Sequence, residues 1–444
     1  MSDLEERVKK AKAAYIRLMS ESTERKDRAL QAMANALDVD RERIKAANLK
    51  DIEAAEEMLA EGKLTKSMLK RLKVDDTKID DMIAGIMDVM KLPDPVGKTL
   101  EALELDNGLE LYKVSTPIGL IGVIFESRPD VVPQIMALCL KSGNATVFKG
   151  GSEAKESNRA LFNVLVGAIA SVDGMPAEAF QLMETRDEVK EMLKLDDYID
   201  LIIPRGSNEF VRYIQDNTRI PVLGHASGIC HIYVDKKADP HKAVDVVLDS
   251  KVQYAAVCNA VETLLIHADV ADSLLPSIAA ALAEKGVEMR CDPRSKELIK
   301  SIGKYVVDAS EDDWDKEYND MIISIKVVDG IDEAISHINL HGSGHTDAIV
   351  TEDPMASRRF VSMVDSSSVM VNASTRFADG YRYGKGAEVG ISTNKIHARG
   401  PVGMEGLMIY KYVLLGNGHV VRDYVGSSAK RFKHSRLEKN LEIR

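Results

Sequence analysis

Residues 118–154 read IGLIGVIFESRPDVVPQIMALCLKSGNATVFKGGSEA, and this stretch decides the fold. A continuous apolar run at residues 118–125 is followed by a polar break, an apolar helix-like segment and a second apolar run at residues 145–149. Buried strands that alternate with helices are typical of a parallel sheet covered on both faces. We therefore predict an α/β fold in which ligands bind at the carboxyl ends of the strands.

The alternation continues after this stretch and restarts beyond a helical segment, which predicts a second α/β domain with a join near Asp235–Pro240. Upstream, residues 1–90 carry apolar side chains at helical spacing with charges on the other face. The predicted domains are residues 1–101 together with 118–235, and residues 236–395.

Two Asn-Gly pairs predict β-hairpins outside these domains. Asn107-Gly108 lies in residues 102–117, and Asn417-Gly418 lies in residues 400–430, each between runs of strand-like residues. An isolated two-stranded hairpin is only marginally stable in water. We expect the two hairpins to pair with each other, with another subunit, or both, and to form an oligomerisation arm. The alternative is that they edge a larger sheet.

The composition excludes several classes of protein. The chain has 444 residues, and 59 Lys and Arg against 70 Asp and Glu give a net charge of −11, so neither nucleic acid nor an anionic membrane is an expected partner. No apolar run is long enough to span a membrane, and the first 15 residues do not form a signal peptide. Four scattered cysteines without a Cys-x-x-Cys pair indicate a reducing, cytoplasmic location and no metal site.

One of the four cysteines is a candidate nucleophile. Cys258 follows a run of small residues and precedes a strand-like segment, where a side chain can face a cleft. Cys139 lies in an apolar helix, Cys230 begins a strand and Cys291 has no helpful neighbours. A buried cysteine is the commoner case, so the residues alone leave Cys258 open between a nucleophile and a core position.

A glycine turn and three polar segments are candidates for binding. Lys149, Gly150, Gly151 and Ser152 join a strand to a helix, where backbone N–H groups can bind phosphate. An ordinary tight connection is the alternative. The other candidates follow predicted strands and are Ser127 with Arg128, His225, and Asn372 with Ser374 and Arg376. The two arginines could bind a carboxylate or phosphate, although for either segment alone a solvated loop with helix-capping Ser and Thr is the commoner case.

Taken in order, several segments resemble the gamma-glutamyl phosphate reductases, which are also called glutamate-5-semialdehyde dehydrogenases and belong to the aldehyde dehydrogenase superfamily. They include PIGLIGVIFESRPD, ATVFKGGSEA, LIIPRGS, PVLGHASGICHIYVD, VCNAVETLLIH, SGHTDAIVTED and VNASTRFADG. The resemblance implies an aldehyde dehydrogenase-like fold of two parallel-sheet α/β domains and a β arm. The first domain would then bind NADP(H) and the second would carry the thiol.

The resemblance also implies an activity, namely NADPH-dependent reduction of L-glutamyl 5-phosphate to L-glutamate 5-semialdehyde with release of phosphate, in proline biosynthesis. Cys258 matches the family's catalytic thiol and would form the thioester, with the backbone at Cys258–Asn259 expected as the oxyanion donor. The residues matched to cofactor binding are Lys149, Gly150, Gly151, Ser152, Arg205, Gly206, Ser207 and Glu317. The general-base glutamate of oxidising relatives is absent. A GHASG segment with His225 stands there, and Ser127 replaces their oxyanion asparagine.

Rival functions remain open at this stage. A coenzyme A-acylating aldehyde dehydrogenase would share the fold and the thiol, and a non-catalytic nucleotide-binding scaffold would share the fold alone. The expected assembly is a homodimer or larger. Channelling of the unstable acyl phosphate from a glutamate 5-kinase is a further partnership that the resemblance leaves open.

Overall fold

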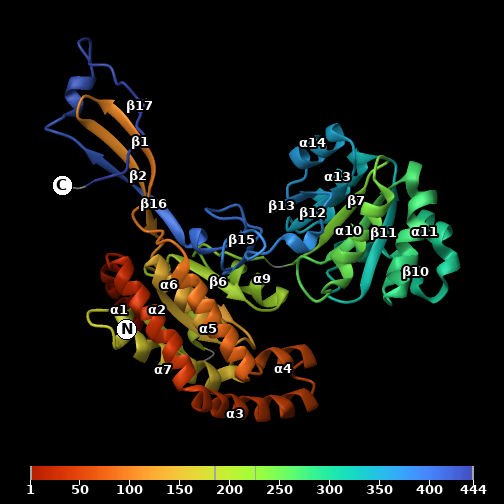
Figure 1. Cartoon of the computed structure of the whole chain (residues 1–444), viewed down its shortest axis with the longest axis horizontal. Coiled ribbons are helices and arrows are strands. Elements are labelled where there is room, and N and C mark those ends of the chain that lie inside the picture. Colours follow the sequence, from red (N-terminus) through yellow and green to blue (C-terminus); the bar gives the residue numbers. More distant parts are fainter. Residues whose placement is uncertain (1–2, 185–186, 226, 443–444) are drawn as a thin grey trace. The chain divides into compact units, whose positions relative to one another are not determined.

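The computed structural model describes residues 3–184, 187–225 and 227–442, and the chain divides into two compact units (Figure 1). Unit 1 comprises residues 1–206, 213–223 and 403–444, and unit 2 comprises residues 207–212 and 224–402. The main change of unit therefore falls at residues 223–224, before the predicted join near Asp235–Pro240. Within the described residues, no helix is both long and apolar enough to cross a membrane.

The predicted helical start of the chain is confirmed. The helices are α1 (Asp3–Leu18), α2 (Thr23–Val39), α3 (Arg41–Ala60), α4 (Lys66–Leu72) and α5 (Asp76–Lys91). Side chains of Ser22, Thr65 and Asp75 accept hydrogen bonds from backbone N–H groups in the first turns of α2, α4 and α5. These caps satisfy N–H groups that a helix cannot bond internally, so each helix begins at a polar residue.

The α/β core of unit 1 is a four-stranded parallel sheet in the order β5-β4-β3-β6. Its strands are β3 (Leu120–Phe125), β4 (Ala145–Gly150), β5 (Phe180–Met183) and β6 (Leu201–Arg205). The main connecting helices are α6 (Val131–Ser142) and α7 (Lys155–Ala170), with the shorter α8 (Asp187–Met192). Helix α9 (Asn208–Asp216) has its first residues in unit 2 and its last in unit 1. From β3 the chain first continues to β4 and β5 on one side of the sheet and later returns to β6 on the other side. A parallel sheet in which the strand order reverses in this way has a crevice at the carboxyl ends of the strands.

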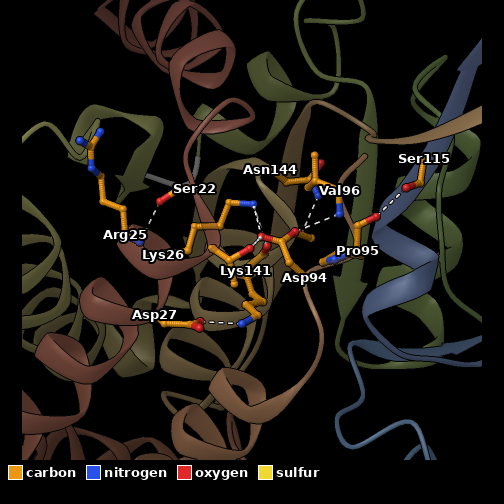
Figure 2. A network of polar contacts seen from close by, with 12 residues as sticks. Ser22, Arg25, Lys26, Asp27, Asp94, Pro95, Val96, Ser115, Lys141 and Asn144 are labelled. Atoms are coloured by element: carbon orange, nitrogen blue, oxygen red, sulfur yellow. Dashed lines mark hydrogen bonds and ion pairs between the residues drawn. The ribbon is translucent and has the colours of Figure 1, made fainter. Parts of the chain in front are cut away.

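Buried ion pairs hold the helices of unit 1 to the start of the β arm (Figure 2). Lys26 on α2 is fully buried, and its Nζ lies 2.9 Å from Asp94 Oδ2. Lys141 on α6 is equally buried and lies 2.5 Å from Asp27 Oδ1. The other carboxylate oxygen of Asp94 accepts the N–H of Val96. Because each buried charge has a partner of opposite sign, the network fixes the segment that leads into the arm.

Unit 2 is built on a seven-stranded parallel sheet in the order β10-β9-β11-β8-β7-β12-β13. The strands are β7 (Cys230–Val234), β8 (Val261–His267), β9 (Glu288–Cys291), β10 (Val306–Asp308), β11 (Ile322–Val328), β12 (Thr346–Val350) and β13 (Ser368–Val371). Its helices are α10 (Pro240–Val252), α11 (Ala268–Glu284), α12 (Pro293–Ile299), α13 (Ile331–His341) and α14 (Pro354–Met363).

One strand lies in a different unit from the one that the sequence predicted. We predicted that residues 118–235 form one domain, but β7 pairs with β8 and β12 in the sheet of unit 2. Its five residues are all buried, and both flanking strands are downstream in sequence. The helical segment after β7 is therefore a crossover within unit 2, and it does not mark a domain boundary.

The β arm is a separate four-stranded sheet in unit 1 with the order β16-β2-β1-β17. The hairpin at Asn107-Gly108 is confirmed, since β1 (Thr99–Asp106) pairs with β2 (Leu109–Pro117). The other strands are β16 (Met408–Leu415) and β17 (Ser435–Arg436). A small two-stranded sheet of unit 2, β14 (Gly390–Ser392) with β15 (Gly400–Val402), contains the first residues of the predicted range 400–430.

The hairpin predicted at Asn417-Gly418 is wrong. Strand β16 pairs with β2 and not with the residues after the turn. Residues 421–424 form a 3₁₀ turn instead, and the hydroxyl of Tyr424 donates to Asp106 at 2.8 Å. The ring of Tyr424 stacks on Phe432. Strand β2 pairs with β16 along the whole length of β16. This long-range pairing, and not the local turn signal, determines the partner of β16.

Candidate active site

The four cysteines differ in exposure. Cys139, Cys230 and Cys291 are buried, whereas Cys258 is half-buried. Burial raises the pKa of the Cys139 thiol and of the Cys291 thiol to about 12. Burial also raises the pKa of Cys230 well above its usual range. Because a nucleophile must be both accessible and ionisable, these three thiols are poor candidates and Cys258 is the remaining one.

Cys258 lies in the loop between α10 and β8, three residues before the strand begins. The backbone of Gly228 packs directly against it, since a Cβ at Gly228 would overlap the Cys258 carbonyl oxygen and Cα. The thiol of Cys230 donates to the same Cys258 carbonyl, at 3.2 Å. Only glycine permits so close an approach of two backbones, so the GHASG segment holds the loop that carries the thiol. Ala226 within that segment lies outside the described residues.

Two histidines lie beside the thiol. The side-chain donor atoms of His225, Cys258 and His345 all lie within 4.8 Å of one another, and the two imidazole rings meet edge to face at 4.9 Å. Nδ1 of His225 lies 2.8 Å from the Ile391 carbonyl oxygen, so the neutral ring donates from Nδ1. Sequence reasoning selected His225 and missed His345, although the segment SGHTDAIVTED contains it.

The three residues meet because of strand order. His225, Cys258 and His345 precede β7, β8 and β12, which are neighbours in the parallel sheet. They therefore lie at the amino ends of these strands. The expectation that ligands bind at the carboxyl ends does not describe the thiol.

The predicted residues Ser374 and Arg376 belong to the same part of unit 2. Ser374 Oγ lies 3.1 Å from Ser250 Oγ, and Arg376 Nε donates to Gln253 Oε1 at 2.9 Å. Burial lowers the pKa of Arg376, Arg382 adds to the lowering, and the charge of Cys258 opposes it. A buried guanidinium within electrostatic reach of the thiol can bind an anionic group there.

Asn259 connects the thiol loop to the Arg376 segment. Its side-chain Nδ2 donates to the Ala378 carbonyl oxygen at 2.8 Å. Its Oδ1 is buried and has no hydrogen-bond partner in the part of the chain that the structure describes. The side chain therefore positions residues 376–378 and keeps one acceptor for a ligand.

Asn372 lies elsewhere. Its side-chain amide pairs with the backbone of Thr351 in both directions, at 2.9 Å each. Thr351 follows β12, so Asn372 is at the carboxyl edge of the sheet. The thiol is at the amino edge, and the two are therefore separated by the length of a strand, which rises ~3.3 Å per residue. The structure gives this predicted binding residue a role in joining the ends of β12 and β13.

The glycine turn of unit 1 fits a cofactor in part. Lys149 is buried at the carboxyl end of β4, and its Nζ donates to the Gly150 carbonyl oxygen. A Cβ at Gly150 would overlap the amide of Asn158, and Asn158 Oδ1 is buried without a partner among the described residues. A close backbone, a cation and an unpaired acceptor suit the phosphate and hydroxyl groups of a dinucleotide.

The helix that follows this turn is less available than the sequence predicted. The N–H groups of Glu156 and Ser157 donate to the carboxylate of Asp51 at 3.1 and 2.7 Å. Burial raises the pKa of Asp51, and the hydrogen bonds from Ser157 oppose the shift. A phosphate in this region would therefore depend on Lys149 and Ser152 more than on the helix N-terminus.

The remaining candidates of unit 1 follow β3 and β6. Ser127 has a positive φ of 48°, and its N–H and hydroxyl both donate to Glu153 Oε1, at 2.6 and 2.8 Å. Arg128 is half-buried beside it. The N–H of Glu126 donates to the Arg205 carbonyl oxygen at 3.0 Å, which brings the ends of β3 and β6 together. Gly206 is the last residue of this stretch of unit 1.

Two predicted cofactor residues lie in unit 2. Ser207 caps α9 by accepting the N–H of Phe210 at 3.4 Å. The next residue, Asn208, donates to Glu317 Oε2 at 2.5 Å. Ser207 and Glu317 are therefore neighbours through Asn208, which the sequence did not predict because 109 residues separate the two bonded side chains.

Comparison with known proteins identifies the family. A family model described as "Aldehyde dehydrogenase family" matches residues 1–299. The gamma-glutamyl phosphate reductase of Methanosarcina acetivorans is 64% identical over 437 residues, which are 98% of each chain. The chain belongs to the gamma-glutamyl phosphate reductase branch of the aldehyde dehydrogenase family.

Solved structures agree with this assignment. The crystal structure of gamma-glutamyl phosphate reductase from Thermotoga maritima is 41% identical, with a TM-score of 0.91, and the match covers 94% of this chain and 100% of that one. A glyceraldehyde-3-phosphate dehydrogenase from Methanocaldococcus jannaschii, solved in complex with NADP, shares the fold at 16% identity and a TM-score of 0.63, with 94% of each chain covered. The family and fold predicted from the sequence are thereby confirmed, and the chain is an enzyme.

Proposed function

We propose that this enzyme reduces L-glutamyl 5-phosphate to L-glutamate 5-semialdehyde with NADPH and releases phosphate, the second step of proline biosynthesis from glutamate. The observation that carries the proposal is Cys258, the half-buried thiol beside two histidines and within electrostatic reach of Arg376. Its relatives at 63–64% identity are named for the same reaction.

Cys258 acts as the nucleophile. Its thiol gives its proton to the adjacent imidazole pair, and the sulfur attacks the acyl carbon of the acyl phosphate. A thioester forms at Cys258 and phosphate leaves with the bonding electrons. Covalent catalysis of this kind divides one difficult step into two easier ones.

Backbone N–H groups at Cys258–Asn259 serve as donors to the oxyanion of the tetrahedral intermediate. Arg376 binds an anionic group of the substrate, because a guanidinium can make paired hydrogen bonds to a carboxylate or phosphate. His225 and Ser374, in the same unit as Cys258, are further proposed substrate contacts. Ser127 and Arg128, in unit 1, stay predictions. Asn372 is not among the proposed substrate contacts, because its side-chain amide is hydrogen-bonded to the backbone of Thr351.

NADPH, when bound, supplies the hydride that converts the thioester to the aldehyde. In unit 1, the proposed cofactor-binding residues are Lys149, Gly150, Gly151, Ser152, Arg205 and Gly206. Ser207 and Glu317, which belong to unit 2, stay predictions. The choice of NADP over NAD is part of the proposal. The segment around His225 offers no general-base carboxylate for water, and this absence protects the thioester from hydrolysis.

The test runs the reaction in reverse. We expect glutamate 5-semialdehyde to support NADP⁺ reduction that depends on added inorganic phosphate, with coenzyme A as the control acceptor. Activity that requires coenzyme A and ignores phosphate would assign the enzyme to the acylating aldehyde dehydrogenases, the runner-up function. Failure of both acceptors would contradict the proposed reaction.

We also propose that the β arm joins two copies of the chain. Strand β16 is an edge strand in the described sheet, and Ile409, Tyr410, Tyr412 and Leu414 on it are exposed. An apolar edge strand of eight residues invites pairing, and twofold symmetry is the commonest way to satisfy it.

The arm proposal is tested by sedimentation. Tyr412→Lys should raise the dissociation constant of the dimer, because it places a charge in the middle of the apolar edge. Val39→Lys is the matched control, since Val39 is 83% exposed on α2. A concentration-independent monomer for the unmodified chain would contradict the proposal.

A further inference from the structure

The cluster of His225, Cys258 and His345 has the composition of a metal site. One thiolate and two imidazoles are ligands that Zn²⁺ accepts, whereas Mg²⁺ and Ca²⁺ require oxygen donors. The three donor atoms lie within 4.8 Å of one another. Ligand atoms around tetrahedral zinc are roughly 3.3–3.6 Å apart, as zinc–ligand bonds of about 2.0–2.3 Å require. Closing the cluster thus takes at most about 1.5 Å of approach between the ligand atoms.

His345 provides a second observation that points to a ligand. The residue is fully buried, and its Nε2 has no hydrogen-bond partner in the part of the chain that the structure describes. Its Nδ1 lies 2.8 Å from Thr346 Oγ1 and 3.7 Å from Cys230 Sγ. A buried imidazole nitrogen without a partner is costly unless a ligand satisfies it.

His225 is oriented as metal-binding histidines are. Its Nδ1 contacts the Ile391 carbonyl oxygen at 2.8 Å. A histidine ligand usually donates its other ring N–H to a carbonyl or carboxylate, which sets the tautomer and the direction of the ring. The lone pair of the neutral ring is then at Nε2.

We infer that His225, Cys258 and His345 form an exchangeable Zn²⁺ site that blocks the enzyme. Zinc replaces the thiol proton, which is released to solvent, and binds the sulfur as thiolate together with one nitrogen of each imidazole. No oxidation state changes. The fourth position stays open to water, as in sites with three protein ligands. Metal binding and attack on the acyl carbon use the same sulfur lone pair, so they exclude each other.

The blocking effect rests on the proposed function, because inhibition follows only if Cys258 is the nucleophile. The metal site itself does not rest on it. Binding and inhibition are therefore measured separately.

The binding test uses Co²⁺ as a spectroscopic probe of the full-length chain after treatment with a chelator. We expect one equivalent to produce thiolate-to-cobalt charge-transfer absorption, which disappears in Cys258→Ala. His345→Ala and, independently, His225→Ala should weaken binding by roughly tenfold or more. His241→Ala is the matched control, because His241 is an exposed histidine on α10 of the same unit. Circular dichroism establishes that each variant folds.

Absence of the charge-transfer band in the unmodified chain, or its persistence in Cys258→Ala, would overturn the site. Zinc should then inhibit the reductase reversibly, with activity restored by the chelator and inhibition relieved as acyl substrate rises. A cobalt band that depends on Cys258 without inhibition by zinc would retain the site and remove Cys258 as nucleophile. Loss of activity in Cys258→Ala with no cobalt band would retain the nucleophile and remove the site.

Discussion

The two units differ in how they treat their buried polar groups. Nine buried side-chain atoms lack a hydrogen-bond partner among the described residues, and only those of Thr146 and Asn158 are in unit 1. Four of those in unit 2 belong to Asn259, His345, Thr375 and Ser392, on segments that surround or support Cys258. Both units also bury paired charges: Lys26 and Lys141 each contact a carboxylate in unit 1, and Lys251 contacts Glu262 at 2.7 Å in unit 2.

This contrast distinguishes stability from function. A closed polar network rigidifies a fold, whereas an unpaired buried atom costs free energy and persists where a ligand will use it. Substitutions in the unit 1 network should therefore reduce stability and spare the chemistry. Substitutions beside Cys258 should impair the chemistry and change stability little.

The largest expected effect is that of Cys258→Ala. Turnover should fall by roughly a thousandfold or more, because the covalent step has no other thiol. NADPH binding, measured by fluorescence titration, should remain nearly unchanged. Cys291→Ala and Cys139→Ala serve as controls that keep the chemistry. If one of those two variants is folded and inactive, the wrong thiol has been chosen.

Asp94→Ala should have the next largest effect, on stability. It leaves the buried ammonium of Lys26 without its carboxylate, and such a loss costs about 3 kcal/mol or more. The midpoint of thermal unfolding should fall by several degrees. The kcat of the variant should stay within about twofold of that of the unmodified chain. The double variant Lys26→Met with Asp94→Leu removes both charges and should recover part of the loss, since the Val96 N–H still loses its acceptor. Equal instability of the double variant would mean that the ion pair is not the cause.

Lys149→Ala should have a smaller effect, and it should change cofactor binding and not stability. It should raise the KM for NADPH by roughly tenfold, the value of one hydrogen bond to a charged group, with a smaller change in kcat. The increase should shrink at high salt if a charge contact is responsible. Lys155→Ala, at the start of α7, is the nearby control. An unchanged KM would remove Lys149 from the cofactor site.

Much of this architecture could be predicted from the sequence. Residues 118–125 are apolar throughout because β3 is buried on both faces, and such strands are readable from composition alone. Asn417-Gly418 misled because a turn signal is local, whereas the partner of β16 lies about 300 residues upstream in β2. Asp51 was missed for a similar reason, since it reaches α7 from α3.

The candidate site was only half predictable. Cys258 and His225 stand in recognisable segments. His345 lies beside them only because β12 pairs with β7. The order of strands in a parallel sheet cannot be predicted from any single segment of the sequence. Asn372 follows a strand just as Arg376 does, yet a left-handed backbone with φ of 54° turns its side chain to Thr351.

The most direct test of the account is to trap the acyl group on the thiol of unit 2. The enzyme is mixed with glutamate 5-semialdehyde and NADP⁺ without phosphate, quenched in acid, digested and analysed by mass spectrometry. We predict a burst of about one NADPH per chain, as expected for a covalent intermediate that cannot turn over, and a glutamyl mass on the peptide that contains Cys258. NADPH formation with no acylated peptide, or with the acyl group on another residue, would contradict the account.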